Sequence, residues 1–152
     1  MFACTGILFN HESPLRKERF VTKKIITTAF KISKGIDIKL NLGNINIQRD
    51  WGWAPEYVNA MWLMLQLDNP DDFIIATGKT TSLKEFINIT FKSLGLNWKD
   101  HVIFDTELIR PTDINLGLAN PNKAKNILNW EAKIGVEEVI RLMLEAEKDL
   151  NE

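Results

Sequence analysis

The fold is decided by the stretch Gly6-Ile7-Leu8-Phe9-Asn10-His11-Glu12-Ser13-Pro14-Leu15-Arg16, in which an apolar run passes directly into a polar loop. The residues from Ala3 to Phe9 predict a short buried strand. An amide, an imidazole, a carboxylate, a proline and a guanidinium follow within seven residues. A strand that opens into such a loop is typical of a ligand-binding edge, because binding residues are commonly carried on loops that a rigid scaffold positions.

The bulk composition is that of one ordinary globular domain. The chain has 152 residues, of which 45% are hydrophobic and 26% charged, and its net charge of −1 argues against nucleic-acid binding. No run approaches the ~20 apolar residues of a membrane helix. Cys4 is the single cysteine and no secretion signal is recognisable, so a cytoplasmic protein without disulfides is expected.

Hydrophobic periodicity predicts an alternation of helices and short strands. A helix is expected from Phe20 to Lys34 with Gly35 as its stop, followed by a β-hairpin formed by residues 38–42 and 45–47 around a Gly-Asn turn. Pro55 suits the first position of a second helix. Its predicted apolar stripe consists of Val58, Met61, Trp62 and Leu65.

The second half of the chain continues the same pattern. Short strands are expected at 73–77 and 102–104, and Ser82 predicts the capped start of a helix that ends at Gly95. Asn120-Pro121 predicts the start of a short helix that runs through Leu128, and a strongly amphipathic helix follows Gly135. The predicted class is α/β, with mixed short strands and helices in a single unit of residues 1–152.

Two features of dinucleotide-dependent enzymes are missing from the sequence. The eight glycines are too scattered to form a phosphate-binding Gly-rich turn after a strand. The single tyrosine, Tyr57, has Met61 rather than a lysine four residues later, so the chain has no Tyr-x-x-x-Lys pair. No Cys/His/Asp cluster has the spacing of metal ligands either, and no metal is predicted.

Several motifs nevertheless resemble one enzyme family over almost the whole chain. They are Asn10-His11-Glu12-Ser13-Pro14, residues 20–25, Leu42-Gly43-Asn44, Arg49-Asp50-Trp51-Gly52, residues 57–66, residues 73–78 and Arg110-Pro111, with Trp130 near the end. Together they resemble the GDP-mannose 4,6-dehydratases, in the sugar-nucleotide-modifying branch of the extended short-chain dehydrogenases. That family combines an N-terminal Rossmann half with a smaller C-terminal part that holds the sugar nucleotide.

The resemblance implies that this chain is the C-terminal substrate-binding part, without the Rossmann half. Residues 1–9 would be the last strand of the missing nucleotide-binding domain, and residues 10–24 the ligand loop and the start of a helix. The family converts GDP-mannose to GDP-4-keto-6-deoxymannose with NADP, and its catalytic residues precede this segment. The resemblance therefore predicts no catalytic residue in this chain and no dehydratase activity of the chain alone.

The same resemblance implies the roles of six binding residues. His11 and Arg16 align with residues that contact NADP, and Asn10 aligns with an amide that contacts the substrate. Arg49 and Arg110 align with arginines that hold the diphosphate of the GDP group, and Lys24 is a further candidate. Leu15, Lys17 and Lys23 depart from the residues usual in the family.

Each of these assignments has a structural alternative. His11 could be a structural side chain, Asn10 a turn residue, and the arginines partners of nearby carboxylates: Asp50 for Arg49, and Glu107 or Asp113 for Arg110.

Three hypotheses for the function remain open at this point. The chain could work with a separately encoded N-terminal half, could bind GDP-sugars without turning them over, or could be an inactive truncated product. An exposed apolar strand at residues 3–9 would favour self-association, and we expect a homo-oligomer.

Overall fold

Short paired strands organise the part of the chain that this computed structural model describes, residues 1–109 and 112–150. Within it, β1 pairs with β6, β2 with β5 and β3 with β8, all in parallel, whereas β4 and β7 are antiparallel. The strands are β1 (Gly6–Leu8), β2 (Asn10–Glu12), β3 (Leu40–Leu42), β4 (Gln48–Arg49), β5 (Trp51–Trp53), β6 (Phe73–Ile75), β7 (Thr81–Ser82) and β8 (Val102–Phe104). Parallel partners need crossover connections, and helices supply them, so the α/β class is confirmed.

Helices fill the connections between these strands. They are α1 (Val21–Ser33), α2 (Ala54–Met64), α3 (Leu83–Ser93), α4 (Asn122–Leu128) and α5 (Val136–Asp149), with 3-10 turns η1 (Trp98–Asp100) and η2 (Thr106–Leu108). The helix predicted from residue 20 ends as expected, because Gly35 has a φ of +83° and its N–H bonds to the carbonyl of Ile32. The predicted cap of α3 is present too, since the Ser82 hydroxyl accepts a hydrogen bond from the Glu85 N–H. The start of α4 differs by one residue, with Pro121 at the N-cap.

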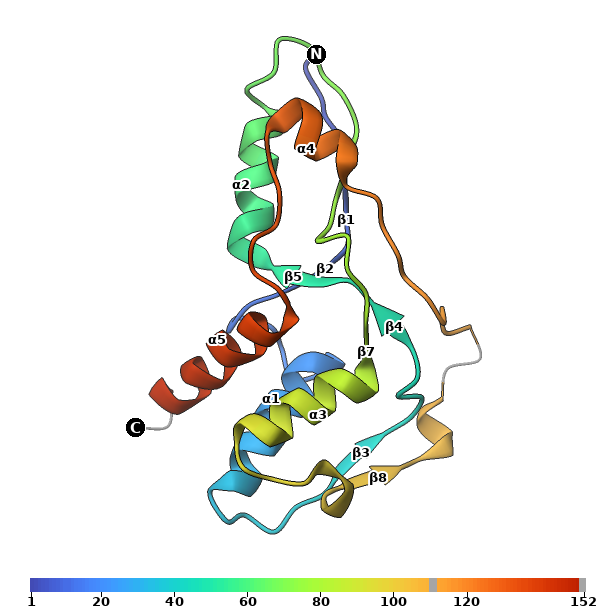
Figure 1. Ribbon diagram of the computed structural model, residues 1–152, viewed down its shortest axis with the longest axis vertical. Coiled ribbons are helices and arrows are strands. Elements are labelled where there is room, and N and C mark those ends of the chain that lie inside the picture. Colours follow the sequence, from blue (N-terminus) through green and yellow to red (C-terminus); the bar gives the residue numbers. More distant parts are fainter. Residues whose placement is uncertain (110–111, 151–152) are drawn as a thin grey trace.

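The described chain has two hydrophobic cores, one in each half of an elongated molecule (Figure 1). In the broader lower half, α1, α3 and α5 pack against one another beside β3 and β8. A buried ion pair between Lys23 of α1 and Glu147 of α5 joins two of these helices. In the narrower upper half, α2 and α4 pack around β1 and β6, and β2 and β5 lie where the halves meet.

The predicted β-hairpin of residues 38–47 is wrong. The first predicted strand is β3, which pairs with β8, and residues 45–47, the second predicted strand, are not in a strand. The carbonyls of Ile45 and Ile47 instead accept hydrogen bonds from the N–H groups of Lys84 and Leu83, at the start of α3. Because these acceptors are used by the first turn of a helix, they are not available for a hairpin ladder.

The predicted apolar stripe of α2 is also wrong, because it lies on the exposed side of the helix. Val58 is 60% exposed and Trp62 is 59% exposed, whereas Tyr57, Ala60 and Met64 are buried. Apolar residues occur on more than one side of α2, and the side that β6 and α4 cover is the one that becomes core. Tyr57 marks that side by packing edge-to-face against Trp130, with ring centroids 5.9 Å apart.

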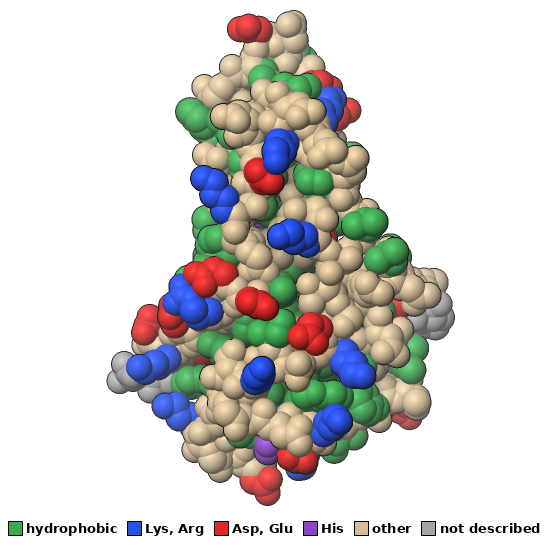
Figure 2. Space-filling view, in the orientation of Figure 1, with side chains coloured by type: hydrophobic (Ala, Val, Ile, Leu, Met, Phe, Trp, Pro, Cys, Tyr) green, Lys and Arg blue, Asp and Glu red, His purple; other side chains and the backbone are tan. Residues whose placement is uncertain are grey.

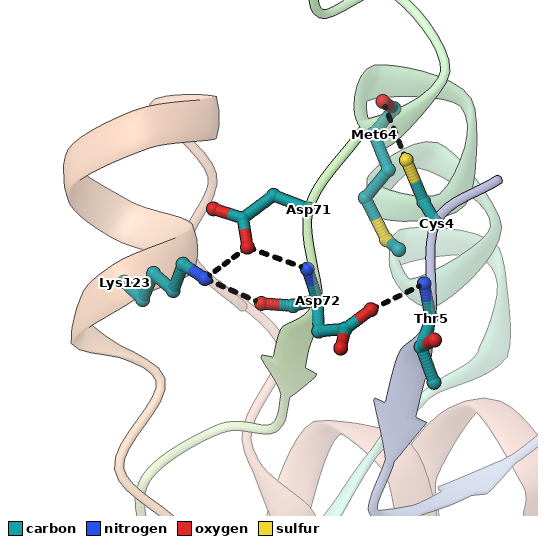
Figure 3. A network of polar contacts seen from close by, with 6 residues as sticks. All are labelled: Cys4, Thr5, Met64, Asp71, Asp72 and Lys123. Atoms are coloured by element: carbon teal, nitrogen blue, oxygen red, sulfur yellow. Dashed lines mark hydrogen bonds and ion pairs between the residues drawn. The ribbon is translucent and has the colours of Figure 1, made fainter. Parts of the chain in front are cut away.

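The predicted N-terminal strand is shorter and less buried than expected. β1 spans three residues, pairs along one edge with β6, and leaves Ile7 52% exposed. Its position is nevertheless well defined (Figure 3): the Thr5 N–H donates to Asp72 at 3.1 Å, and the Cys4 thiol contacts the Met64 carbonyl. Lys123 of α4 completes this network by binding Asp71 and the Asp72 carbonyl.

No helix among the described residues is long and apolar enough to cross a membrane.

Candidate functional site

A cavity of about 770 Å³ lies beside β2, the first turn of α1, the end of β3, and β4. This volume is within the range of small-molecule sites. The lining residues are Asn10, Glu12, Arg16, Arg19, Phe20, Val21, Thr22, Lys24, Asn41, Leu42, Gly43, Asn44, Ile47, Arg49, Trp51, Leu83, Leu108 and Asp113.

Strand β2 divides the ligand loop between two sides. Asn10 and Glu12 both line the cavity, as residues two apart on a strand must when one of them does. His11 lies between them and is not part of the lining. Its ring stacks on Tyr57 with centroids 4.8 Å apart, and its Nδ1 lies 2.8 Å from the Phe9 carbonyl. Because a carbonyl can only accept, Nδ1 donates this hydrogen bond, and in the neutral ring Nε2 is then an acceptor.

Glu12 and Arg16 form an ion pair at the edge of the cavity. The Glu12 side chain is fully buried, and Arg16 Nε lies 3.2 Å from its Oε2. Burial raises the pKa of Glu12, while the charge of Arg16 and a hydrogen bond with Thr22 oppose the rise. The Arg16 guanidinium also lies 4.2 Å from the ring centre of Phe20, so its geometry is set on two sides.

Lys24 and Arg19 are the two lining cations that have no acidic partner among the described residues. Lys24, at the end of the first turn of α1, donates to the Asn41 carbonyl at 2.7 Å, which directs its amine across the cavity toward the end of β3. The guanidinium of Arg19 lies 5.1 Å from the ring of Phe20, on the exposed rim.

Arg49 is held by contacts with residues 113 and 114. Its Nη2 lies 3.1 Å from Asp113, and its Nη1 donates to the carbonyls of Gln48 and Ile114. The alternative pairing with Asp50 is wrong, because Asp50 is buried and accepts from the N–H groups of Thr77 and Gly78. Arg49 therefore faces the cavity with its charge shared with Asp113.

The predicted site residues are only partly brought together. Asn10, Arg16, Lys24 and Arg49 line the same cavity, His11 lies on the other side of β2, and Arg110 lies outside the described residues. Sequence reasoning missed the part played by Asp113, which it paired with Arg110, and by Leu108. No group of three or more metal-ligating side chains occurs within residues 1–109 and 112–150.

The charges around the cavity favour an anionic ligand. Four cationic side chains and two acidic ones line it, and Phe20, the N-cap of α1, leaves the first N–H groups of that helix without a side-chain cap. On the face shown in Figure 2, by contrast, acidic and basic side chains are interspersed without a patch of one sign. The lining of the cavity itself thus carries more positive than negative side chains.

Comparisons with known proteins agree over nearly the whole chain. A family model described as GDP-mannose 4,6 dehydratase matches residues 1–143. "GDP-mannose 4,6 dehydratase 1" of Arabidopsis thaliana is 47% identical over 150 residues, which are 99% of this chain and 42% of that protein. "GDP-mannose 4,6 dehydratase" of Homo sapiens is 41% identical over 167 residues, covering 99% of this chain and 45% of its own length. The chain therefore spans less than half the length of the curated relatives that it matches.

Solved structures show the same fold at lower identity. RMD from Pseudomonas aeruginosa, complexed with NADPH, matches 95% of this chain and 48% of its own with a TM-score of 0.86 and 16% identity. dTDP-glucose 4,6-dehydratase from Bacillus anthracis, in complex with NAD, matches 95% of this chain and 44% of its own with a TM-score of 0.79 and 18% identity. At these identities the likeness establishes the fold alone.

Proposed function

Because the chain belongs to the GDP-mannose 4,6 dehydratase family, we propose that its cavity binds the nucleoside diphosphate part of a GDP-sugar, GDP-mannose or a close relative. The observation that carries this proposal is the convergence of Asn10, Arg16, Lys24 and Arg49 on one cavity. Three cations and an amide, from β2, α1, β4 and the loop before α1, suit a phosphorylated ligand, because they offer several charge-assisted donors in one place.

In this proposal the diphosphate lies between Lys24, Arg49 and the first turn of α1. Lys24 is free of carboxylates among the described residues, and the N-terminus of a helix offers N–H groups to an anion. Arg49 exchanges part of its contact with Asp113 for a phosphate oxygen, which keeps its guanidinium on an anionic partner throughout. Asn10, on the adjacent face of β2, serves the sugar end, and Arg110 remains a candidate from its sequence position.

A nicotinamide cofactor fits this chain only in part. His11 offers Nε2 as an acceptor, and Arg16 offers a guanidinium that Glu12 already engages. The glycines do not form a phosphate-cradling turn, so these residues could supply edge contacts but not a dinucleotide site. We propose that His11 and Arg16 contact NADP that is held chiefly by the remainder of a longer enzyme.

The chain then acts as the substrate-binding part of a GDP-mannose 4,6-dehydratase, a single domain of residues 1–152 whose first strand belongs to a larger sheet. Conversion of GDP-mannose to the 4-keto-6-deoxy sugar needs groups that this chain lacks, and a nucleotide-binding half would supply them. Without that half, we propose that the chain binds GDP-sugars without turning them over and associates with a second copy of itself.

Calorimetric titration with GDP, GDP-mannose and NADPH tests the proposal. GDP is expected to bind, and Lys24→Ala and Arg49→Ala are each expected to weaken binding by roughly 1.5–3 kcal/mol, the scale of charge-assisted hydrogen bonds. Asp113→Asn is expected to tighten GDP binding, because Arg49 loses a competing carboxylate. High salt should reduce all of these differences.

A matched control is Lys92→Ala, which removes the same charge from an exposed position of α3 outside the cavity. Its GDP affinity should equal that of the wild type. Equal affinity of the wild type and both cavity variants would show that Lys24 and Arg49 are only surface charges, and no binding by the wild type would contradict the proposed function itself.

A further inference from the structure

Gly43 has no room for a side chain, and the obstacle is backbone. A Cβ at this position would lie 2.7 Å from the Leu108 carbonyl oxygen, 2.8 Å from its carbonyl carbon and 3.1 Å from the Ile109 nitrogen. Real Cβ atoms essentially never approach other atoms to within 3.0 Å, and a peptide group cannot move away by changing rotamer. Gly43 differs in this from Gly52, where the obstacle is the side chain of Tyr57.

The requirement for glycine at position 43 is therefore one of space. Gly35, Gly78 and Gly95 have positive φ angles, whereas Gly43 does not, so a left-handed backbone is not what requires glycine at this position. What Gly43 permits is the close approach of the Leu108–Ile109 peptide to the end of β3. Gly43 and Leu108 both line the cavity, so this contact joins two of its walls.

The segment 105–109 has few other anchors. The Asp105 N–H bonds to the Leu42 carbonyl at 2.9 Å, and η2 is closed by bonds from Leu108 to Asp105 and from Ile109 to Thr106. The side chains of Leu108 and Ile109 are 47% and 48% exposed, so burial in the core does not fix them. Backbone contact with β3 is what holds this wall in place.

We propose that Gly43 is a positioning residue of the cavity, which holds segment 105–109, and with it Leu108, at the distance needed to enclose a nucleotide. The identity of the ligand in this inference rests on the proposed function, whereas the positioning of segment 105–109 rests on the contact between Gly43 and Leu108. A methyl group at residue 43 would push the peptide outward, break the Asp105–Leu42 bond and open this side of the cavity.

Gly43→Ala tests the proposal with two readouts. Amide hydrogen exchange should become faster at Asp105, Leu108 and Ile109, and GDP affinity should fall by about tenfold. The control is Gly135→Ala, where a Cβ meets nothing within 4 Å and φ is −85°. The melting temperatures of Gly43→Ala and Gly135→Ala should be similar. A merely structural role of Gly43 would instead lower the melting temperature of Gly43→Ala without faster local exchange at residues 105–109.

Asp105→Ala is a second variant that should loosen segment 105–109, and it keeps the proposal testable if Gly43→Ala does not fold. The Asp105 carboxylate caps η2 by accepting from the Glu107 N–H at 2.9 Å, and its side chain does not line the cavity. It should likewise accelerate exchange and weaken GDP binding.

Unchanged exchange at 105–109 in Gly43→Ala would overturn the proposal, as would faster exchange with unaltered GDP affinity in both variants. If the wild type does not bind GDP, the proposed function is wrong, and the exchange comparison alone decides whether Gly43 holds the wall.

Discussion

Glu12 is the side chain of the cavity whose environment is least favourable to its charge. It is fully buried, and desolvation raises its pKa in spite of the Arg16 guanidinium beside it. Its position follows from β2, since the alternation that turns Asn10 into the cavity turns Glu12 there too. Even without a ligand, Arg16 therefore has a structural role, because its charge compensates the buried carboxylate of Glu12.

Arg16→Ala should destabilise the fold by roughly 1–3 kcal/mol at neutral pH, the cost of a buried polar group left without its partner. The loss should shrink as the pH falls. The pKa of Glu12 is higher in the folded than in the unfolded chain. Glu12 therefore contributes most to stability at a pH below its unfolded-state pKa, and this contribution is lost as the pH rises through its folded-state pKa. Without Arg16 the pKa of Glu12 rises further, so the free energy of unfolding of the variant should decrease more with increasing pH than that of the wild type.

Urea denaturation at about pH 5 and about pH 7.5 measures this difference. Arg19→Ala is the matched control, because it removes an equal charge from the same rim and leaves Glu12 paired. A destabilisation by Arg16→Ala that does not depend on pH would contradict the assignment of Glu12 as its cause.

Among the elements, α3 shows how a local signal fixes part of the cavity. Its N-cap, Ser82, is also the last residue of β7, so the strand turns directly into the helix. Leu83, the first helical residue, is buried and lines the cavity, and its N–H bonds to the Ile47 carbonyl. The start of α3 thereby ties β4 and the segment before it to the lower core.

Ser82→Ala should lower the free energy of unfolding by about 1 kcal/mol, because the Glu85 N–H loses its acceptor. Ser93→Ala, near the other end of the same helix, should cost less, since its hydroxyl only donates to the Ile89 carbonyl, which the helix already engages. Thermal melts of both variants check this expectation. Equal losses would show that the Ser82 cap contributes nothing specific.

At the scale of the whole molecule, the upper half presents an apolar surface that no described element covers. It consists of the outward side of α2 (Val58, Met61, Trp62 and Leu65) and a groove of about 240 Å³ that Cys4, Gly6, Leu8 and Met64 also line. Ile7, between Gly6 and Leu8, is exposed on the other face of β1. The free edge of β1 adjoins this groove. Exposed edges and apolar patches of this kind favour association.

The chain should form a dimer or larger assembly in solution, and Ile7→Lys and Trp62→Lys should each shift it toward monomer. Both side chains are more than half exposed, so neither change should disturb the fold. Light scattering at high protein concentration provides the measurement. Lys92→Ala controls for surface changes elsewhere, and a monomeric wild type would rule the expectation out.

The purified chain should produce no 4-keto-6-deoxy sugar from GDP-mannose with added NADP. It has neither a Gly-rich turn nor a Tyr-x-x-x-Lys pair, so proton abstraction and hydride transfer have no carriers in it. Product analysis against a blank without protein tests this, and GDP binding in the same preparation shows that the chain is folded. Turnover above the blank would contradict the proposed division of roles.

Features that depend on neighbouring residues could be predicted from the amino-acid sequence. Helices α1, α3 and α5, the Ser82 cap and the Gly35 stop were predictable because periodicity and capping involve residues a few positions apart. The family motifs, and the absence of a catalytic pair, are equally properties of the sequence as written. Four of the six predicted binding residues also prove to share one cavity.

The contacts between distant segments, by contrast, could be learned only from the three-dimensional structure. β3 pairs with β8 rather than with its neighbour along the chain, α2 buries Tyr57 and Met64 rather than Val58 and Trp62, and Arg49 binds Asp113 rather than Asp50. A strand carries donors and acceptors on both edges, and a helix with apolar residues on several sides can bury any of those sides. An arginine can pair with any carboxylate within reach. Local sequence patterns do not specify any of these contacts, because they depend on the packing of elements that lie tens of residues apart.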